Sequence, residues 1–587
     1  MARFIIFLLL YSAAAIAQVD VSIDKFSDAT SFYVSFNNGS GNVSVSNNYS
    51  DFVAGNSSMQ IDYSFNGGNN FFFTTFKNYS TATKDWSFNI TKFILRYKGG
   101  NANSQIKLRL WEDINRNGSN DSEDEVYVCT GPTGAQSSWT LAQFEVANFS
   151  KLAGNGNGQL DLNRIRAYDI AVENISNTSQ NAQFLFDELL MHSTYSPPQN
   201  NGAKLSGSFV QLWNSSGCNC GQWTVQQWKD EMQKMKDVCL NTLVVQYSVY
   251  NDLAWYSSSN LAFVQYKEST LNKIFEAAEE KGIKIYVGLY FDENWNNADK
   301  NLNATYSNLR VKHQQVINEL YNAFALNTSF KGWYIPQEIN DLEWQSNSNK
   351  NLLFNWLQDV ASYAHSKDAS KKVMIAPFFN LWMPADVLKD WYNDMLAVAT
   401  DIDQVFPQDG VGITLKNVYY DVPLFYSKIK EACDANGVEF GATVESFKQT
   451  TGWPVDNGVF SAQPTNINTL VAQINEANAN QASEIIQFEW TYMQSSLYDD
   501  YLNSALCIST NSVVIDEHEF HFYPNPVNEQ INFNTVVKSI KVYSNDGVLL
   551  KSINNASSLN VEDLAQGFYV LQVQVDSVAI QHKIVVQ

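Results

Sequence analysis

Residues 283–290, IKIYVGLY, form a short apolar run, and an amphipathic helical run, NLRVKHQQVINELYNAFA, follows at residues 308–325. The same alternation of apolar strand and amphipathic helix repeats through the middle of the chain, which is typical of βαβ units and a parallel sheet. Eight strands can be counted, at residues 205–213, 241–247, 283–290, 332–338, 372–379, 401–409, 438–445 and 484–490. Eight units in roughly 300 residues predict a (β/α)8 barrel over residues 199–510.

An open, doubly wound sheet is the alternative for this region. The segment contains no G-x-G-x-x-G sequence and no phosphate-binding loop, which are the signals such a sheet commonly carries. The barrel is therefore the favoured fold.

The segments on either side of the barrel have a different pattern. Residues 18–198 contain short alternating runs such as SFYVSF and KFILRYK between Asn/Gly/Ser clusters, which predicts a β-sandwich or jelly roll. The Pro-Pro and Asn-Gly pairs within residues 196–204 indicate a linker. Residues 516–587 return to alternating runs and predict a small β-sandwich. The chain is thus expected to be multidomain.

The N-terminus has the features of a secretory signal peptide at residues 1–17. Arg3 precedes an apolar stretch at residues 4–16, and Ala15-Ile16-Ala17 matches an A-x-A cleavage site. A buried apolar strand is the alternative. No later stretch reaches about 18 apolar residues, so no transmembrane segment is expected.

The charge and the cysteines exclude several kinds of protein. A formal net charge of −22 argues against nucleic acid as a partner, because that affinity depends on Lys and Arg. Six cysteines allow 15 disulfide pairings, among which the sequence does not choose. Cys218 and Cys220 are one residue apart, which is not the spacing of a C-x-x-C motif. With six scattered histidines, and neither G-x-S-x-G nor H-E-x-x-H present, no catalytic cofactor or metal is expected.

Two glutamates are the strongest candidates for catalysis. Glu338 and Glu445 end the fourth and seventh predicted strands, and catalytic side chains of such barrels lie at these carboxyl ends. Glycoside hydrolysis uses two carboxyl groups, of which one is protonated and the other ionised. The alternative is that one or both glutamates lie on the surface or in salt bridges.

This arrangement resembles the large clan of retaining (β/α)8 glycosidases. The resemblance implies that Glu338 is the acid/base and Glu445 the nucleophile, with repulsion from Glu445 helping to keep Glu338 protonated. That clan usually has Asn before the fourth-strand glutamate, where this chain has Gln337.

Other residues at the predicted strand ends are candidates for substrate binding. They are Gln211, Trp213, Tyr247, Tyr290, Asp292, Gln337, Asp409, Glu489 and Trp490. Seven tryptophans lie at or just beyond these ends, and aromatic faces suit the C–H faces of sugars. They are Trp213, Trp255, Trp295, Trp344, Trp382, Trp453 and Trp490. Packing is the alternative for any single one of them.

Three segments resemble known families. GSFVQLW at 207–213, WYIPQEI at 333–339 and VESF at 444–447 make the barrel similar to a bacterial family of glycoside-hydrolase-like TIM barrels that is described as a domain of unknown function. YPNPV at 523–527 and LAQGFYVLQV at 564–573 resemble the C-terminal sorting domain of the type IX (Por) secretion system. This second resemblance implies export through the periplasm of a Gram-negative bacterium to the cell surface or the medium, with the type IX machinery as a partner. An accessory β-domain is the alternative.

The N-terminal segment resembles carbohydrate-binding jelly rolls in two stretches, IDKFSDAT and QFLFDELLMHS. A purely structural sandwich is the alternative. Within this segment, residues 113–124 have the alternating oxygen spacing of a calcium loop, with Gly118 at the turn. The expected ligands of a structural Ca²⁺ are Asp113, Asn115, Asn117, Asp121 and Asp124. Asp124 stands where such loops usually have Glu, flanking helices are not expected, and a polar hairpin loop is the alternative.

Two functions follow from these observations. The first is a secreted glycoside hydrolase of the retaining type that acts on an extracellular polysaccharide or oligosaccharide. The second is a surface protein that binds glycans through a degenerate barrel without cleaving them.

Overall fold

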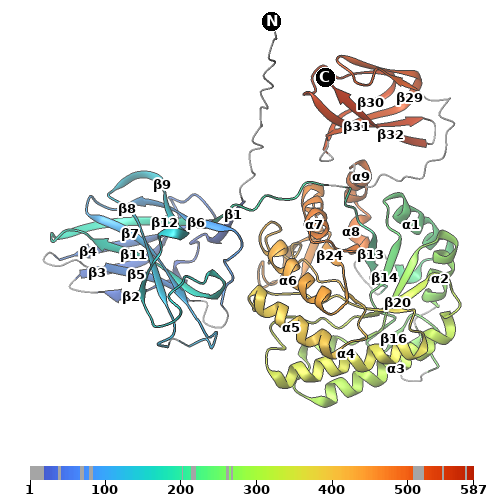
Figure 1. Cartoon of the computed structure of the whole chain (residues 1–587), viewed down its shortest axis with the longest axis horizontal. Helices are drawn as coiled ribbons and strands as arrows, with labels where there is room; N and C mark the ends of the chain where they lie inside the picture. Colours follow the sequence, from blue (N-terminus) through green and yellow to red (C-terminus); the bar gives the residue numbers. More distant parts are fainter. Residues whose placement is uncertain are drawn as a thin grey trace, which may run out of the picture. The chain divides into compact units, whose positions relative to one another are not determined.

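The computed structural model describes residues 19–37, 41–66, 72–78, 83–119, 121–200, 202–212, 220–259, 263–265, 269–504, 506, 521–544, 548–575 and 578–587 (Figure 1). The predicted signal peptide and Trp213 lie outside these residues. The chain divides into two compact units, residues 1–197 with 381–388, and residues 198–380 with 389–587. None of the helices in the described part of the chain is long and apolar enough to cross a membrane.

The N-terminal region contains two antiparallel sheets of six strands each. The first has the order β3-β4-β12-β6-β9, with β1 paired to β12, and the second has the order β10-β8-β7-β11-β5-β2. The strands are β1 (Val19–Asp24), β2 (Tyr33–Asn37), β3 (Gly41–Asn48), β4 (Ser58–Phe65), β5 (Phe72–Asn78), β6 (Ile90–Gly99), β7 (Ser104–Glu112), β8 (Val126–Thr133), β9 (Gln136–Glu145), β10 (Ser150–Ala153), β11 (Ile165–Asn174) and β12 (Gln180–Ser193). Single 3-10 turns lie at η1 (Ala29–Ser31), η2 (Val146–Asn148) and η3 (Leu162–Arg164).

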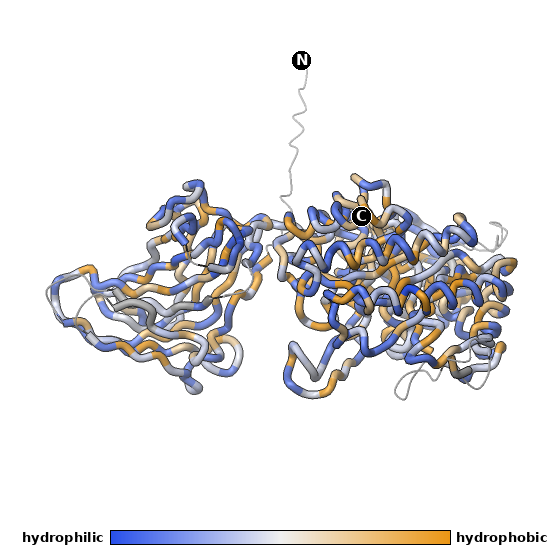
Figure 2. Tube along the Cα trace, turned by 90° about the horizontal axis from the view of Figure 1, so that it is seen from below, coloured by the Kyte–Doolittle hydropathy of each residue, from blue (hydrophilic) through white to orange (hydrophobic). Residues whose placement is uncertain are grey.

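The two sheets share one hydrophobic core. Trp86 contacts Phe93 of β6 in the first sheet and Tyr168 of β11 in the second, with ring centroids 5.7 and 6.3 Å away. Along β4 the buried residues alternate with half-buried ones, and hydrophobic and hydrophilic residues alternate along many strands (Figure 2). This period of two produced the β prediction, and it follows from strand geometry.

A parallel sheet forms the centre of the second unit. Its order is β23-β22-β21-β20-β18-β14-β13-β27-β24. The strands are β13 (Gly207–Val210), β14 (Thr242–Val245), β18 (Lys284–Gly288), β20 (Phe330–Ile335), β21 (Lys372–Ile375), β22 (Gln404–Val405), β23 (Glu439–Phe440), β24 (Ala442–Glu445) and β27 (Ile485–Phe488). Only Gly441 separates β23 from β24, and Gln408 also bridges to Thr443. The two ends of the sheet therefore meet in one run of chain, which makes a nearly closed barrel.

Helices follow the barrel strands along the chain. They are α1 (Val225–Asp237), α2 (Thr270–Lys281), α3 (Asn303–Phe324), α4 (Asn347–Lys367), α5 (Ala385–Val398), α6 (Asp421–Ala435), α7 (Ile467–Ala479), α8 (Trp490–Met493) and α9 (Ser496–Asn503), with 3-10 turns η4 (Cys220–Gln222) and η5 (Glu293–Asn297). Helix α1 illustrates why they form. Thr224 and Gln227 cap its start reciprocally, and Trp228, Met232 and Met235 make its buried stripe.

The interior of the barrel is filled by one cluster of side chains. It consists of Phe209, Val244, Tyr286, Tyr334, Met374, Ala376, Phe406 and Ile486, with Phe488 packed against it. These residues come from or directly follow seven different strands of the sheet. The barrel is therefore a packed core, and any site must lie above it, at the ends of the strands.

Two small sheets that the sequence did not predict lie among the barrel loops. One joins β15 (Val249–Tyr250), β16 (Leu253–Ala254), β17 (Val264–Gln265) and β19 (Tyr290–Phe291). The other is a hairpin of β25 (Phe447–Thr451) and β26 (Ser461–Pro464), which begins two residues after Glu445.

The C-terminal region contains one antiparallel sheet with its own core. Its strands are β28 (Phe522–Tyr523), β29 (Gln530–Ser544), β30 (Leu549–Asn560), β31 (Gly567–Val575) and β32 (Val578–Val586). They bury a cluster that includes Val527, Ile540, Val573 and Ile584.

A buried ion pair in the N-terminal region gives a test of its energetics. Arg109 of β7 makes two hydrogen bonds of 2.7 Å to Asp169 of β11, which also accepts from Trp111. Burial raises the pKa of Asp169 although Arg109 opposes the shift. The free-energy cost of desolvating the Asp169 carboxylate therefore exceeds the stabilisation that Arg109 gives it.

We expect Arg109→Met to destabilise the N-terminal region by about 3–5 kcal/mol, because it leaves the Asp169 carboxylate buried without its partner. The double variant Arg109→Met/Asp169→Leu should lose much less. Hydrogen exchange of the β7 and β11 amides in the full chain measures both. Equal losses in the single and the double variant would contradict this account.

Candidate active site

The carboxyl ends of the barrel strands bring several carboxyl groups to one end of the sheet. Glu445 is the last residue of β24, Glu489 directly follows β27, and Glu338 lies three residues after β20. In a parallel sheet these ends open on the same side. The sequence predicted all three positions.

Glu445 is buried beside a second carboxylate and a lysine. Its backbone N–H donates to Asp409, and its own carboxylate accepts from the Ile413 N–H at 2.8 Å. Gln473 donates both to Asp409, at 2.7 Å, and to the Glu445 carbonyl. Burial and the neighbouring Asp409 raise the pKa of Glu445, while the Lys416 charge opposes the shift.

Lys416 is the cation of this cluster, and no pattern in the sequence indicated it. The side chain is buried, and among the described residues its Nζ has no hydrogen-bond partner. It lies 4.2 Å from the centroid of the Phe379 ring. Burial lowers the pKa of Lys416, and Glu445 and Asp409 are the first charges that raise it again. The charges of Lys416 and the two carboxylates therefore act on one another, although Lys416 Nζ makes no hydrogen bond to either carboxylate.

Glu489 is held in place by hydrogen bonds from both sides. Its carboxylate accepts from the Gln211 N–H at 3.0 Å and from the Thr491 hydroxyl at 2.7 Å. Burial nevertheless raises the pKa of Glu489 to about 7. The Glu489 carboxyl group can therefore gain or lose its proton near neutral pH.

Glu338 differs from Glu445 because its side chain is exposed to solvent. The protein around it still raises the pKa of Glu338 by desolvation, with repulsion from Glu343 as the second cause. Repulsion from Glu445, which was expected to keep Glu338 protonated, is not among the causes of this shift. The carboxyl group accepts no hydrogen bond from any residue that the structure describes, whereas the Glu338 carbonyl accepts one from Trp295 at 3.0 Å. The backbone is fixed while the carboxyl group stays free to turn.

The pKa values of three tyrosines respond to these carboxyl groups. Besides burial, Glu338 raises the pKa of Tyr334, and Tyr334 and Glu489 are among the charges that raise the pKa of Tyr247. Burial, Glu489 and Glu445 together raise the pKa of Tyr492 to about 12. Tyr492 was also missed, because it lies inside α8 rather than at a strand end.

The other predicted residues take different positions. Gln337 is buried and donates to the Tyr290 carbonyl at 2.8 Å, with its Oε1 unpartnered among the described residues. Tyr247 is buried in a stack with Tyr250 and Phe291. Trp490 is completely buried and donates to Glu231 of α1. The rings of Tyr247 and Trp490 are therefore almost completely shielded from solvent.

Tyr290 and Asp292 line a pocket of about 500 Å³. The Tyr290 hydroxyl donates to Asp292 at 3.0 Å, and Trp295 and Lys312 of α3 contribute to the wall. Because Trp295 also bonds the Glu338 carbonyl, this pocket lies beside the loop that carries Glu338.

Most of the tryptophans at the strand ends belong to the core. Trp255, Trp295 and Trp344 are buried, and Trp295 stacks on Trp344 with centroids 5.7 Å apart. Trp453 is exposed over 69% of its surface. A position at a strand end does not indicate whether a tryptophan ring points into the core or into solvent. The sequence pattern therefore could not separate the buried tryptophans from the exposed one.

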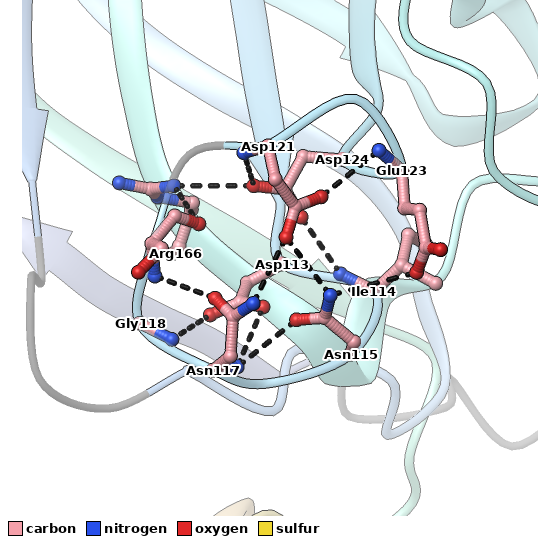
Figure 3. Close-up of polar contacts among 10 residues, drawn as sticks. Asp113, Ile114, Asn115, Asn117, Gly118, Asp121, Glu123, Asp124 and Arg166 are labelled. Carbon is pink, nitrogen blue, oxygen red and sulfur yellow. Dashed lines mark hydrogen bonds and ion pairs between the residues drawn. The ribbon is translucent and has the colours of Figure 1, made fainter.

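The predicted calcium loop is closed by its own hydrogen bonds (Figure 3). Asp113 accepts from the Asn117 and Gly118 N–H groups, and the amides of Asn115 and Asn117 both donate to Asp121 at 2.9 Å. Asp124 accepts from the Ile114 and Asp121 N–H groups.

The side chain of Arg166 in β11 makes hydrogen bonds to the same loop. It donates to Asp124 at 3.2 Å and to the Ser119 carbonyl at 2.8 Å, which are two positions that a calcium loop of this spacing uses as ligands. No group of three or more His, Cys, Asp or Glu side chains in the described residues is arranged to hold a metal ion. The loop as it stands does not fit Ca²⁺, which would require Arg166 and the two amides to turn away.

The class of this protein follows from its fold and its site: a multidomain chain with a parallel barrel whose mouth is lined by carboxylates. Residues 205–496 match the model of DUF4434, described as a domain of unknown function, and residues 521–587 match that of a secretion system C-terminal sorting domain. The expected resemblances of the barrel and the tail are thereby confirmed.

Relatives and solved structures of similar fold are distant. The uncharacterized protein YbcH of Escherichia coli K12 is 31% identical over 198 residues, which are 33% of this chain and 62% of that protein. A proposed α-L-fucosidase from Bacteroides thetaiotaomicron is 20% identical, covering 52% of this chain and 94% of its own, with a TM-score of 0.43. A family 11 carbohydrate-binding module from Clostridium thermocellum is 21% identical, covering 30% and 94%, with a TM-score of 0.23.

Calcium binding stays a prediction with a direct test. If Ca²⁺ displaces Arg166 and binds only the folded loop, it stabilises the N-terminal region by about 2.7 kcal/mol at a hundredfold excess over Kd. Scanning calorimetry of the full chain with calcium, and then with chelator, measures this shift. The variant Asp113→Asn should abolish it. An unchanged midpoint in the parent protein would leave the loop as a polar hairpin connection.

Proposed function

We propose that this protein is an exported glycoside hydrolase that acts on an extracellular polysaccharide or oligosaccharide. In this proposal the central region is a (β/α)8 barrel, in which each of the eight strands is followed by helix, with β23 and β24 as one strand. The observation that carries the proposal is the group of carboxyl groups with raised pKa at the strand ends. Groups of this kind, desolvated beside specific charges, are typical of acid–base sites.

Glu338 has the properties of the acid/base. Its carboxyl group reaches solvent, and desolvation and Glu343 favour its protonated form. A proton donor to a glycosidic oxygen needs both access and a raised pKa.

Glu445 is assigned as the nucleophile, which must be ionised to react. The Lys416 charge and the Ile413 N–H favour the ionised form, against burial and Asp409. Because Asp409 and Glu445 interact strongly, they take up protons as a pair. We assign Asp409, Gln473 and Lys416 to positioning this carboxylate, and Glu489, Gln211 and Tyr290 to substrate contacts.

Glycan binding without cleavage is the second candidate. The hydrogen-bonded Gln337 counts against cleavage. This amide donates to a backbone carbonyl and therefore does not offer that N–H group to a sugar hydroxyl. In that case the carboxylates would bind hydroxyl groups only, and no variant of Glu338 would alter a product.

The terminal regions complete the proposal. The sorting domain supports export by the type IX secretion system, to the surface or the medium. The N-terminal sheets would bind glycan and bring the barrel to its substrate.

Deleting residues 516–587 should trap the protein in the periplasm of a host that has the type IX system, while the purified truncated chain keeps its activity. The reason is that the tail has its own sheet and buried core, separate from the barrel carboxylates. Fractionation followed by immunoblotting measures export. Normal secretion of the truncated chain would contradict the sorting role.

Glu338→Gln and Glu445→Gln should each lower hydrolysis by at least about a hundredfold, since general acid–base catalysis alone contributes about 10²–10⁴. The two variants should fail differently. Without Glu445 no glycosyl-enzyme can form, so every substrate is lost. Without Glu338 an activated aryl glycoside still reacts in the first step, and azide should rescue the turnover of Glu338→Ala.

Glu439→Gln is the matched control for these variants. Glu439 begins the strand that Glu445 ends, so it lies at the opposite end of the barrel, where it forms a salt bridge with Lys372. It should retain wild-type turnover, measured as reducing ends released from a panel of polysaccharides. Wild-type rates in both active-site variants would show the assignment to be wrong, and Glu489 and Asp409 would be tested next.

A further inference from the structure

The hairpin of β25 and β26 carries an exposed apolar tip next to the candidate active site. This arm, residues 447–464, contains Trp453, Val455, Val459 and Phe460, which are exposed over 69%, 45%, 88% and 54% of their surfaces. Large side chains grouped in this way at one loop are costly to leave in water and mark a binding surface.

The arm is held rigid at its base. The buried Gln449 side chain donates to the carbonyls of Thr451, Gly452 and Trp453 at 2.9 to 3.0 Å. Asp456 accepts from the Gly452 and Gly458 N–H groups at 2.7 and 2.8 Å. The exposed rings are therefore presented by an ordered loop, so little entropy is lost when a ligand binds to them.

The base of the arm is joined to the residues that hold Glu445. The Gln449 N–H donates to the Gly412 carbonyl at 2.8 Å, and the N–H of the next residue, Ile413, donates to the Glu445 carboxylate. The Thr465 N–H donates to Ser446, which directly follows Glu445. Two hydrogen bonds therefore connect the base of the arm to the Glu445 carboxylate.

Aromatic rings lead from the tip of the arm to the carboxylates. Phe460 lies 6.0 Å from Phe447, and Phe447 lies 5.1 Å from Tyr492, between ring centroids. Tyr492 is the tyrosine whose pKa both Glu489 and Glu445 raise. Ring contacts therefore lead from the exposed tip of the arm to α8, which begins directly after Glu489.

The chemistry of the arm selects its ligand. It has one lysine and one aspartate, so its formal charges cancel in a chain of net charge −22, and its other polar groups are Thr, Gln, Asn and Ser. A stable protein interface uses about 20–30 residues a side, far more than this tip offers. Aromatic faces beside uncharged polar groups suit the C–H faces and hydroxyls of neutral sugars.

We propose that the arm is a glycan-binding extension of the Glu445 site, in which Trp453 and Phe460 stack on sugar rings of a neutral chain. This inference rests on the proposed function and narrows its substrate to chains of several sugars, which reach from the carboxylates to the tip of the arm.

Affinity electrophoresis tests the arm apart from catalysis. The parent is the full chain with Glu445→Gln, run in gels that contain soluble neutral polysaccharides. Adding Trp453→Ala or Phe460→Ala should weaken binding about tenfold, the size of one aromatic contact, and Trp453→Phe should retain most of it. Phe568→Ala is the matched control, because this phenylalanine of the C-terminal sheet is also exposed over 54% of its surface.

The outcomes separate the two proposals. If wild-type protein cleaves a polysaccharide but Trp453→Ala binds as tightly as the parent, the arm proposal is wrong and the hydrolase stands. If the parent binds and Trp453→Ala does not, while wild-type protein cleaves nothing, the arm stands and the hydrolase is wrong. Binding to no polysaccharide overturns the arm. A dimer in sedimentation velocity that Trp453→Ala abolishes also overturns it, in favour of an interface between two copies.

Discussion

Desolvation of carboxyl groups above a closed, aromatic barrel interior is the constraint on which the candidate site depends. Phe209, Tyr334 and Phe406 are part of the cluster that fills the barrel interior. Glu445, Glu489 and Asp409 are buried at the strand ends above this cluster. Charged carboxylates are disfavoured there unless partners compensate. The Ile413 and Gln211 N–H groups, Gln473 and the buried Lys416 are such partners, and each lies on a loop or helix next to the sheet.

This constraint explains which residues the sequence could predict. The alternation of apolar strands and helices identified the strands of the parallel sheet in their chain order, with β23 and β24 predicted as one strand, because that period follows from burying both faces of a parallel sheet. Glu338, Glu445 and Glu489 were found because strand ends are recognisable in the pattern. The paired portion of a strand is shorter than its apolar run: residues 401–409 were expected, and only Gln404–Val405 form β22.

Other features depend on tertiary contacts that no local pattern records. Lys416 lies in a loop eleven residues after β22, and nothing in the neighbouring sequence indicates that its charge acts on Glu445. Tryptophans at strand ends were grouped together, yet Trp344 and Trp490 turn into the protein and Trp453 turns out. The charge that acts on Glu338 comes from Glu343, five residues along the same loop, and not from the opposite strand. In the predicted calcium loop, the partner outside the motif is Arg166 of β11, which is distant in sequence.

The most direct measurement is a crystal structure of the Glu445→Gln variant with a bound neutral oligosaccharide. A hydrolase at this site requires a glycosidic oxygen within hydrogen-bonding distance of Glu338 and the adjacent sugar carbon facing residue 445. A separation of about 5–5.5 Å between the two side-chain carboxyl or amide groups would match a retaining mechanism, and about 6.5–9.5 Å an inverting one. A sugar chain bound away from Glu338, or lying across the mouth with no linkage between the two residues, would contradict the account.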